Sequence, residues 1–367
     1  MSEQKPKIGF IGLGLMGSAM VQRLQSVGYE LTVMAHRNRT PIEEAVARGA
    51  VEAANAAGVA RSSDIIMICV DTTAAVESVM RGDEGVLAGL NEGALVIDFG
   101  TSIPGSTRTL YQECKAKGAS MMDAPLGRTP AQAVDGLLNI MGAGDEADFA
   151  RAKPVLDDLG ENVFHVGPVG AGHTLKLINN FFAMTTASAM AEAFGIADRS
   201  GIPRQALYDV MASGPLHSGM MDFVKAYAID GEIELAFSVD NGSKDVGYFR
   251  EMAEALKSDA QIATVLRLAA GADVALVGLG APTPHSIVLR TGTILSNEDL
   301  ERLQELGAVG DIALRYMDRD GNPIDLEINE RIIGLTLEQI RNIPRVIGIA
   351  GGTAESCVLP LLVQVPQ

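Results

Sequence analysis

The chain has 367 residues, of which 47% are hydrophobic, and this length predicts two or three domains with well-filled cores. Its formal net charge of −17 argues against nucleic acid and anionic membranes as partners, because both attract basic surfaces. The three cysteines, Cys69, Cys114 and Cys357, lie far apart and do not form a C-x-x-C motif. With no signal region and no apolar run of membrane-spanning length, we expect reduced thiols in a cytoplasmic protein.

The first predicted elements form a dinucleotide-binding turn. Residues 7–11 make a short apolar strand that runs directly into the glycine-rich segment 12–17, and an apolar stripe then predicts a helix. In this context the glycines of G-x-G-x-x-G make a tight turn, let backbone N–H groups approach a pyrophosphate, and pack the helix on the strand. We therefore expect cofactor contacts at Gly12, Gly14, Leu15, Met16 and Gly17.

The strand predicted at 31–35 bears on the choice between the two nicotinamide dinucleotides. An NAD site needs an acid at the end of this strand to hold the ribose 2′-hydroxyl, but the chain continues with His36, Arg37, Asn38 and Arg39. Two arginines and a histidine favour a 2′-phosphate, so we predict NADPH as the cofactor, with NAD as the second choice. Contacts are expected from Arg37, Asn38 and Arg39, and an exposed basic turn is the alternative.

Two further strands are predicted at 65–70 and 94–97, as continuous apolar runs with helical stretches between them. Strands that alternate with helices predict an α/β fold with a doubly wound parallel sheet. Such sheets bind ligands at the carboxyl ends of their strands, and we expect cofactor contacts there from Val70, Asp71 and Thr101. The hydroxyls after the second run could instead cap the next helix.

Segment 122–133 predicts an anion site. Thr129 followed by Pro130 is typical of a helix N-cap and first helical residue, so free N–H groups and the positive end of the helix dipole are expected there. Arg128 adds a planar fork of donors beside them. Together these groups suit a carboxylate, a sulfonate or a phosphate, and an ordinary capped helix with an exposed arginine is the alternative.

Residues 170–180 give the strongest indication of catalysis. Lys176 and Asn180 are four residues apart in an apolar, helix-forming run, so both side chains point into the same space. The lysine can protonate a developing alkoxide, and the amide can hold the substrate oxygen in line. A solvated helix face is the plainer interpretation of this pair.

Four ordered motifs over about residues 7–256 resemble the β-hydroxyacid dehydrogenase family, which includes 3-hydroxyisobutyrate dehydrogenase and tartronate semialdehyde reductase. The motifs are residues 12–17, 98–104 with 123–129, 170–180, and 244–247. The resemblance implies an NAD(P)-dependent aldehyde reductase with a Rossmann domain, a long interdomain helix and a partial all-α domain. It implies Lys176 as the catalytic acid/base, Asn180 as the residue that orients the substrate, and Lys244 near the nicotinamide and substrate. The related imine reductases lack the lysine, which argues here for a carbonyl or alcohol substrate.

One departure from the family pattern concerns the substrate. Most members carry Ser-Gly-Gly where this chain has Gly-Arg-Thr, a version that resembles the sulfolactaldehyde reductase branch, in which the arginine and threonine hold the sulfonate. The implied substrate contacts are Gly127, Arg128, Thr129, Asn179 and Lys244. We expect a small anionic aldehyde and its hydroxy acid, with 3-sulfolactaldehyde first and carboxylated semialdehydes of the tartronate or 3-hydroxyisobutyrate type second. The same resemblance implies a homo-oligomer, either a dimer or a tetramer.

The last 110 residues change character and again predict α/β structure. We expect a buried strand at 271–277, a helix capped at 296–299, a strand at 312–317, a hairpin turn at 318–322, a helix capped at 336–339 and a strand at 346–350. The turn lacks the glycine and glutamate positions of a calcium loop, since position twelve is Asn329, and no metal site is expected. This part resembles the C-terminal half of the sugar-binding effector domain of SorC/DeoR-type regulators, on residues 307–312, 318–323, 331–335 and 350–352.

The predicted domains are therefore 1–167, which binds the dinucleotide, 168–257, which is helical and truncated relative to the family, and 258–367, the added α/β segment. Two function classes stay open. The first is an NADPH-dependent reductase, which the set Lys176, Asn180 and Lys244 favours. The second is a cofactor-binding or sugar-phosphate-sensing fusion protein without turnover, which the loss of the family's last helices favours.

Overall fold

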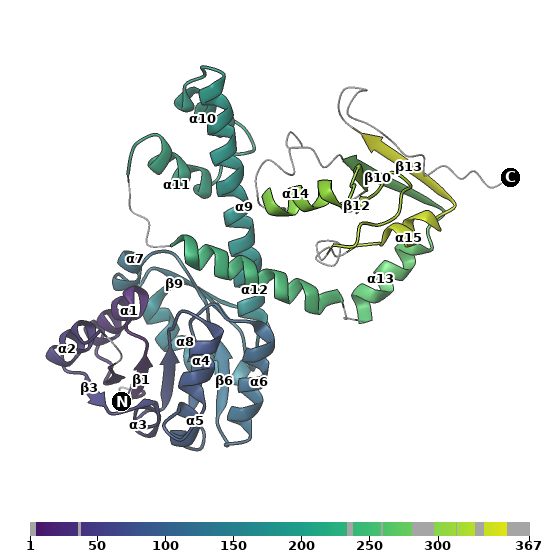
Figure 1. Cartoon of the computed structure of the whole chain (residues 1–367). Coiled ribbons are helices and arrows are strands. Elements are labelled where there is room, and N and C mark those ends of the chain that lie inside the picture. The colour runs from purple at the N-terminus through teal and green to yellow at the C-terminus, as the bar shows by residue number, and fades with distance from the viewer. Residues whose placement is uncertain are drawn as a thin grey trace. The chain divides into compact units, whose positions relative to one another are not determined.

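The computed structural model describes most of the chain, and Figure 1 labels many of its helices and strands. The described ranges are 5–35, 38–232, 238–257, 260–280, 297–312, 314–326 and 334–350. They fall into two compact units, of which the first is Met1–Ala187 with His217–Met252 and the second is Ser188–Leu216 with Ala253–Gln367. Boundaries after residues 167 and 257 stay a prediction. No helix in the described ranges is both long and apolar enough to cross a membrane.

A six-stranded parallel sheet forms the centre of the first unit, with the strand order β3-β2-β1-β4-β5-β6. Its strands are β1 (Ile8–Ile11), β2 (Leu31–Met34), β3 (Val51–Ala53), β4 (Ile65–Ile68), β5 (Leu95–Asp98) and β6 (Ser120–Asp123). The connecting helices are α1 (Leu15–Ser26), α2 (Thr40–Ala47), α3 (Ala56–Arg61), α4 (Thr73–Met80), α5 (Val86–Gly89) and α6 (Pro104–Lys115). This arrangement confirms the predicted doubly wound sheet.

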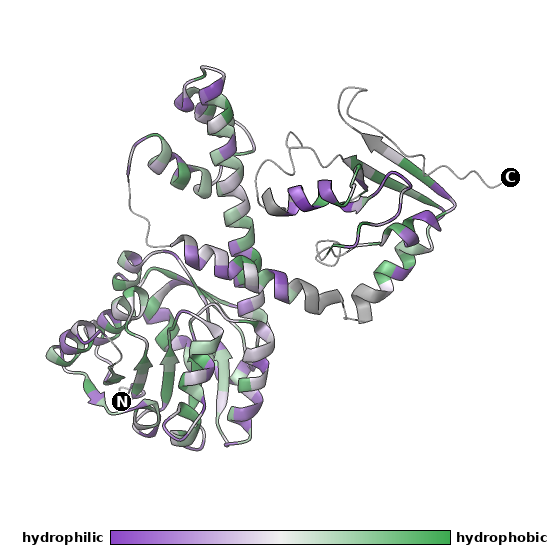
Figure 2. Ribbon diagram, in the orientation of Figure 1, coloured by the Kyte–Doolittle hydropathy of each residue, from purple (hydrophilic) through white to green (hydrophobic). Residues whose placement is uncertain are grey.

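The strand β4 explains why the sheet could be predicted from continuous apolar runs. Its side chains alternate between two cores, with Ile65 and Met67 in one and Ile66 and Ile68 in the other. All four are fully buried, because helices cover both faces of the sheet. Figure 2 shows the strands of this sheet as hydrophobic.

A second, three-stranded sheet follows in the first unit, and the sequence did not predict it. It has the order β7-β8-β9, with β7 (Leu126–Gly127) antiparallel to β8 (Leu138–Gly142) and β8 parallel to β9 (Gly160–His165). Two helices accompany it, α7 (Pro130–Val134) and α8 (Glu146–Leu159). The two-residue strand β7 leads directly into the Arg128–Thr129 turn, so this sheet positions the predicted anion site.

Four helices follow the sheets along the chain, namely α9 (Ala171–Arg199), α10 (Arg204–Ala212), α11 (Gly219–Ala228) and α12 (Val239–Lys257). The predicted helix over Lys176 and Asn180 is thus confirmed as the first part of α9. The start of this helix is held by Asp123, the last residue of β6. Its carboxylate accepts hydrogen bonds from the backbone N–H groups of Gly170 (2.7 Å) and His173 (2.8 Å). The buried acid therefore joins the sheet to the helix that carries Lys176.

In the second unit a four-stranded sheet has the order β12-β11-β10-β13. Its strands are β10 (Val274–Gly280), β11 (Gly310–Ile312), β12 (Arg315–Met317) and β13 (Arg345–Ala350), and its helices include α13 (Ala260–Ala270), α14 (Asn297–Glu305) and α15 (Leu337–Arg341). The predicted α/β character of this part is confirmed. Some residues on which the sequence predictions rest lie outside the described residues, namely 331–333, 351–352, Asn329, Cys357 and the cap residue Ser296.

Two predictions for the second unit were wrong. The strand expected at 312–317 is a hairpin of β11 and β12, in which Ile312 pairs with Arg315 and Leu314 turns the chain with a φ of 67°. Apolar alternation runs through the turn without glycine or asparagine, so the sequence carries no sign of the reversal. The strand expected at 271–277 begins only at Val274, and it alternates between exposed and half-buried residues instead of being buried.

Two other predictions for this unit are confirmed. The turn over 318–322 is held by the Asp318 carboxylate, whose Oδ1 accepts hydrogen bonds from the N–H groups of Asp320 (2.9 Å) and Asn322 (2.7 Å). Thr336 caps α15 through a capping box with Gln339.

Candidate active site

The glycine-rich turn between β1 and α1 has the geometry that a dinucleotide needs. Gly12 has a φ of 98°, and a Cβ there would clash with the carbonyl oxygen of Cys69. A Cβ at Gly17 would clash with the carbonyl oxygen of Gly12, whereas a Cβ at Gly14 would meet nothing within 4 Å. Protein packing therefore explains Gly12 and Gly17. Gly14 is the N-cap residue of α1 and provides no side-chain hydrogen bond to the first N–H groups of the helix. It leaves open space in which a pyrophosphate could approach the backbone.

Two cavities meet at this turn. They measure about 410 and 510 Å³ and share Gly14, Cys69, Val70 and Asp71 in their walls. Each lies in the range of small-molecule sites, and the pair suits an elongated ligand with two parts, such as a dinucleotide. Other predicted cofactor contacts line only one of the two cavities. The smaller cavity is lined by Gly12 and Asn38, and the larger by Leu15, Met16, Gly17 and Thr101.

The basic turn after β2 does not resolve the choice of cofactor. Arg39 already has partners, since its guanidinium makes two hydrogen bonds to Glu52 (3.1 and 3.0 Å) and lies 3.6 Å from Glu43. Arg37 and the neighbouring His36 lie outside the described residues. Because Glu52 neutralises one of the two arginines, the preference for NADPH stays a prediction that rests mainly on Arg37.

Lys176 reaches the larger cavity from the first turns of α9. Its ammonium donates a hydrogen bond of 2.7 Å to the backbone carbonyl of Leu126, at β7. Burial is the main cause that lowers the pKa of Lys176. The negative charge of Asp245 raises this pKa, and the positive charge of Lys244 lowers it further. The lysine is thus oriented, half-buried and easier to deprotonate than an exposed lysine.

Asn180 has a different environment from Lys176, and its predicted role in orienting the substrate stays a prediction. The Asn180 amide is buried and donates a 2.6 Å hydrogen bond to Oδ2 of Asp245 on α12. Neither Asn180 nor Asn179 lines the larger cavity; Asn179 instead donates to the side-chain oxygen of Asn180 (3.4 Å). Lys244 does line it, 3.1 Å from Oδ1 of Asp245, so Asp245 joins two predicted site residues. Sequence reasoning gave Asp245 no role, although it belongs to the motif at 244–247.

Arg128 lies in the wall of the larger cavity with an unusual backbone, since its φ is 81°. Its Nη1 donates to the Leu137 carbonyl (2.6 Å) and lies 2.5 Å from the Glu161 carboxylate of β9. Its Nε and Nη2 make no hydrogen bond within the described ranges. Glu161 was not expected, because β9 itself was not predicted.

Thr129 forms the N-cap of α7 as predicted, in a capping box with Gln132. Both Thr129 and Pro130 line the larger cavity, while Gly127 pairs in β7 and does not. Because α7 has only five residues, its dipole is small, and the Thr129 hydroxyl already accepts one of its first N–H groups. Anion binding at this place stays a prediction, and it rests on Arg128 more than on the helix.

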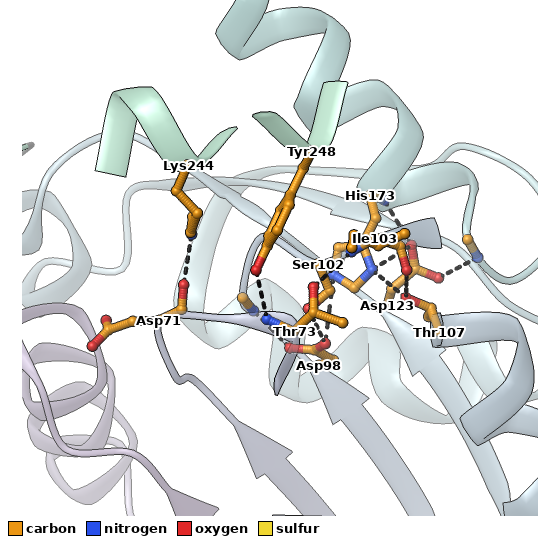
Figure 3. A network of polar contacts seen from close by, with 12 residues as sticks. Asp71, Thr73, Asp98, Ser102, Ile103, Thr107, Asp123, His173, Lys244 and Tyr248 are labelled. Atoms are coloured by element: carbon orange, nitrogen blue, oxygen red, sulfur yellow. Dashed lines mark hydrogen bonds and ion pairs between the residues drawn. The ribbon is translucent and has the colours of Figure 1, made fainter. Parts of the chain in front are cut away.

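A buried polar network lies at the carboxyl ends of β5 and β6 (Figure 3). His173 is fully buried, with Nδ1 2.8 Å from the Thr107 hydroxyl and Nε2 3.7 Å from the carboxylate of Asp98. Burial raises the pKa of Asp123, the other acid beside this ring.

The hydroxyls that follow β5 do not cap the helix α6. The Ser102 hydroxyl donates to Asp98 (3.0 Å), and α6 has Ile103 as its N-cap residue, which makes no side-chain hydrogen bond to the helix. The alternative interpretation, in which the hydroxyls of Thr101 and Ser102 cap this helix, is therefore wrong.

Comparison with known proteins agrees with this geometry. Residues 7–167 match the family of the NAD binding domain of 6-phosphogluconate dehydrogenase, residues 170–288 the NAD-binding domain of NADP-dependent 3-hydroxyisobutyrate dehydrogenase, and residues 249–356 a putative sugar-binding domain. The 3-sulfolactaldehyde reductase of Escherichia coli K12 is 34% identical over 252 residues, which cover 68% of this chain and 84% of that protein. The chain belongs to the 3-hydroxyisobutyrate dehydrogenase family. The resemblance found in the sequence is thus confirmed.

Other relatives give the same family. The 2-hydroxy-3-oxopropionate reductase of E. coli K12 is 31% identical over 251 residues, covering 68% of this chain and 85% of that protein. The solved structure of Mycobacterium tuberculosis 3-hydroxyisobutyrate dehydrogenase with L-serine superposes with a TM-score of 0.64 at 26% identity, over 70% of this chain and 89% of that one. The chain is therefore an NAD(P)-dependent oxidoreductase with an additional segment that resembles a sugar-binding domain.

The glycine-rich turn generates a paired prediction. Gly14→Ala places a methyl group in the open space beside α1, so we expect an unchanged melting temperature and a weaker affinity for the dinucleotide. Gly17→Ala forces a methyl group against the Gly12 carbonyl, so we expect a lower melting temperature. Thermal unfolding and cofactor titration of both variants test this, and equal losses of stability in the two would contradict it.

Proposed function

We propose that the chain reduces a small anionic aldehyde to its hydroxy acid, with NADPH as the preferred cofactor and 3-sulfolactaldehyde as the first candidate substrate. Carboxylated semialdehydes of the tartronate type are the second. The observation that carries the proposal is the oriented ammonium of Lys176 in the wall of the same cavity as the glycine-rich turn. The name of the E. coli relative and the Gly-Arg-Thr segment both support a sulfonate.

The proposed chemistry divides between cofactor and protein. The nicotinamide, when bound, supplies a hydride to the aldehyde carbon. Lys176 holds a proton at Nζ for the oxygen that becomes an alkoxide, and the Leu126 carbonyl fixes the direction of the ammonium. Orientation and the positive charges of Lys176 and Lys244 beside the developing oxyanion lower the barrier. In the direction of alcohol oxidation the same lysine, as a neutral amine, accepts the proton.

The acid group of the substrate is assigned to Arg128. Because Nη1 is occupied by the Leu137 carbonyl and Glu161, the guanidinium is anchored at one end. Its Nε and Nη2 make no hydrogen bond in the part of the chain that the structure describes, and such donors suit a three-oxygen sulfonate or a carboxylate. Thr129 lies next to them in the cavity wall and completes the proposed anion site.

The alternative is a cofactor-binding or sugar-phosphate-sensing fusion without turnover, which the sugar-binding match at 249–356 favours. We place the reductase first because Lys176 and Lys244 both line the larger cavity. For the reductase we also propose the domain division 1–167, 168–257 and 258–367, and a homo-oligomer as the working form.

Removal of the lysine tests the proposed acid. With Lys176→Ala we expect kcat for aldehyde reduction to fall by about 10²–10⁴, the usual size of a general-acid effect, while NADPH still binds. The measurement is oxidation of NADPH, and of NADH in parallel, with 3-sulfolactaldehyde, tartronate semialdehyde and succinic semialdehyde. The control is Lys153→Ala, which removes an exposed lysine paired with Asp157. A Lys176→Ala variant with nearly full kcat would exclude Lys176 as the acid.

The lowered pKa of Lys176 predicts the pH dependence. Reduction consumes the proton of the ammonium, so kcat/KM is expected to fall as the pH rises through a pKa below the roughly 10.4 of a free lysine. Alcohol oxidation needs the neutral amine and is expected to rise over the same range. Lys244→Met removes a neighbouring positive charge and shifts the falling limb to higher pH, whereas Asp245→Asn removes a negative charge and shifts it to lower pH. If the falling limbs of the pH profiles coincided in the unmodified protein and both variants, Lys176 would not be the titrating group.

Removal of the guanidinium tests the anion site. With Arg128→Ala we expect the KM for the anionic aldehyde to rise at least tenfold, since charge-assisted hydrogen bonds contribute about 1.5–3 kcal/mol each, and NADPH affinity to stay nearly constant. Steady-state kinetics and cofactor titration give the two quantities. Arg81→Ala, which removes a surface arginine paired with Glu113, is the control. Unchanged kinetics in Arg128→Ala would remove this residue from the site.

A further inference from the structure

The helix α12 is fastened to the loop between β4 and α4 by two side chains (Figure 3). Lys244 and Tyr248 are four residues apart and share one helix face. Lys244 Nζ donates to the carbonyl of Asp71 (2.6 Å), and the Tyr248 hydroxyl accepts a hydrogen bond from the backbone N–H of Thr73 (3.1 Å). The ammonium also lies 5.5 Å from the centre of the tyrosine ring, so the two contacts support each other.

The Thr73 N–H has a particular need for this partner. Thr73 is the first residue of α4, and the first N–H groups of a helix have no acceptor within the helix. The N-cap residue Thr72 satisfies Ala75 through its side chain, and Tyr248 satisfies Thr73. Because Thr73 is only 7% exposed, loss of the tyrosine oxygen leaves a largely buried donor without a ready replacement.

The connection continues from Thr73 to a second loop. The Thr73 hydroxyl oxygen accepts a hydrogen bond of 3.0 Å from the backbone N–H of Ile103, the N-cap of α6. Tyr248 thereby reaches both the β4–α4 loop and the β5–α6 loop. The first contributes Val70 and Asp71 to the walls of the larger cavity, and the second contributes Gly100 and Thr101.

We propose that Tyr248 is a positioning residue that holds these two loops in place around the cofactor and slows its release. The inference rests on the family's NAD(P) chemistry and on the assignment of the two cavities to the dinucleotide. Asp71 lies in the walls of both cavities, so a ligand that occupies them contacts the loop that Tyr248 and Lys244 hold. Lys244 also faces the proposed substrate, but Tyr248 does not line either cavity, and its role is confined to the loops.

The first test is Tyr248→Phe, which removes the hydroxyl and keeps the ring near Lys244. We expect NADPH to dissociate roughly 2- to 10-fold faster in stopped-flow fluorescence, the effect of one lost hydrogen bond, with little change in the KM of the aldehyde. In the protein without cofactor, we expect faster hydrogen exchange in the peptide spanning residues 70–76. The matched control is Tyr111→Phe, which removes a hydroxyl bonded at 2.9 Å to Asp145 on the surface.

Thr73→Val is the second test, since it removes the acceptor of Ile103 and keeps the N–H that Tyr248 binds. Here we expect faster exchange around residues 100–105 while residues 70–76 keep their protection. Unchanged dissociation and exchange in Tyr248→Phe, or the same changes in Tyr111→Phe, would overturn the role of Tyr248. If the unmodified protein bound neither NADPH nor NADH, the proposed function itself would fail, whereas normal binding with unchanged release would refute the positioning role alone.

Discussion

The Asp123 carboxylate at the end of β6 is the interaction on which the candidate active site depends. Its two oxygens accept the backbone N–H groups of Gly170 and His173, and so fix where α9 begins relative to the sheet. Lys176 follows His173 by three residues, so it rises from the first turns of a helix whose start is fixed on the sheet. The cost of burying the acid, visible in its raised pKa, is offset by these bonds and by the neighbouring imidazole.

A second constraint is the balance of charge at the cavity. Two ammonium groups, Lys176 and Lys244, share one buried carboxylate, Asp245, which also holds the Asn180 amide. Burial and Lys244 favour a neutral Lys176, and Asp245 favours the charged form. The role proposed for Lys176 in reversible aldehyde reduction uses both forms, and the net result of these opposing effects is a lowered pKa. The Asn180 amide contacts Asp245, and the role predicted for Asn180 in orienting the substrate stays a prediction.

Local sequence patterns predicted the structural features that depend on residues close together in the chain. The glycine-rich turn, the parallel sheet and the capped helices all follow from periodicity and from residues close in the chain. Contacts between distant segments could not be found this way: Glu161 lies 33 residues from Arg128, and Asp245 lies 65 residues from Asn180. The strand expected at 312–317 failed for a related reason, because apolar alternation continues through a reversal made by Leu314.

Along the chain, the match to the sugar-binding domain begins after the residues that form the candidate site. The matches to the dehydrogenase and sugar-binding families overlap at residues 249–288, and the last residues tied to the cavity walls, Lys244, Asp245 and Tyr248, all precede that overlap. Every residue that lines the two cavities belongs to the first unit. All the described residues in the walls of the two cavities therefore precede residue 249, where the match to the sugar-binding domain begins. The helix α12, which carries all three of these residues, continues into the overlap.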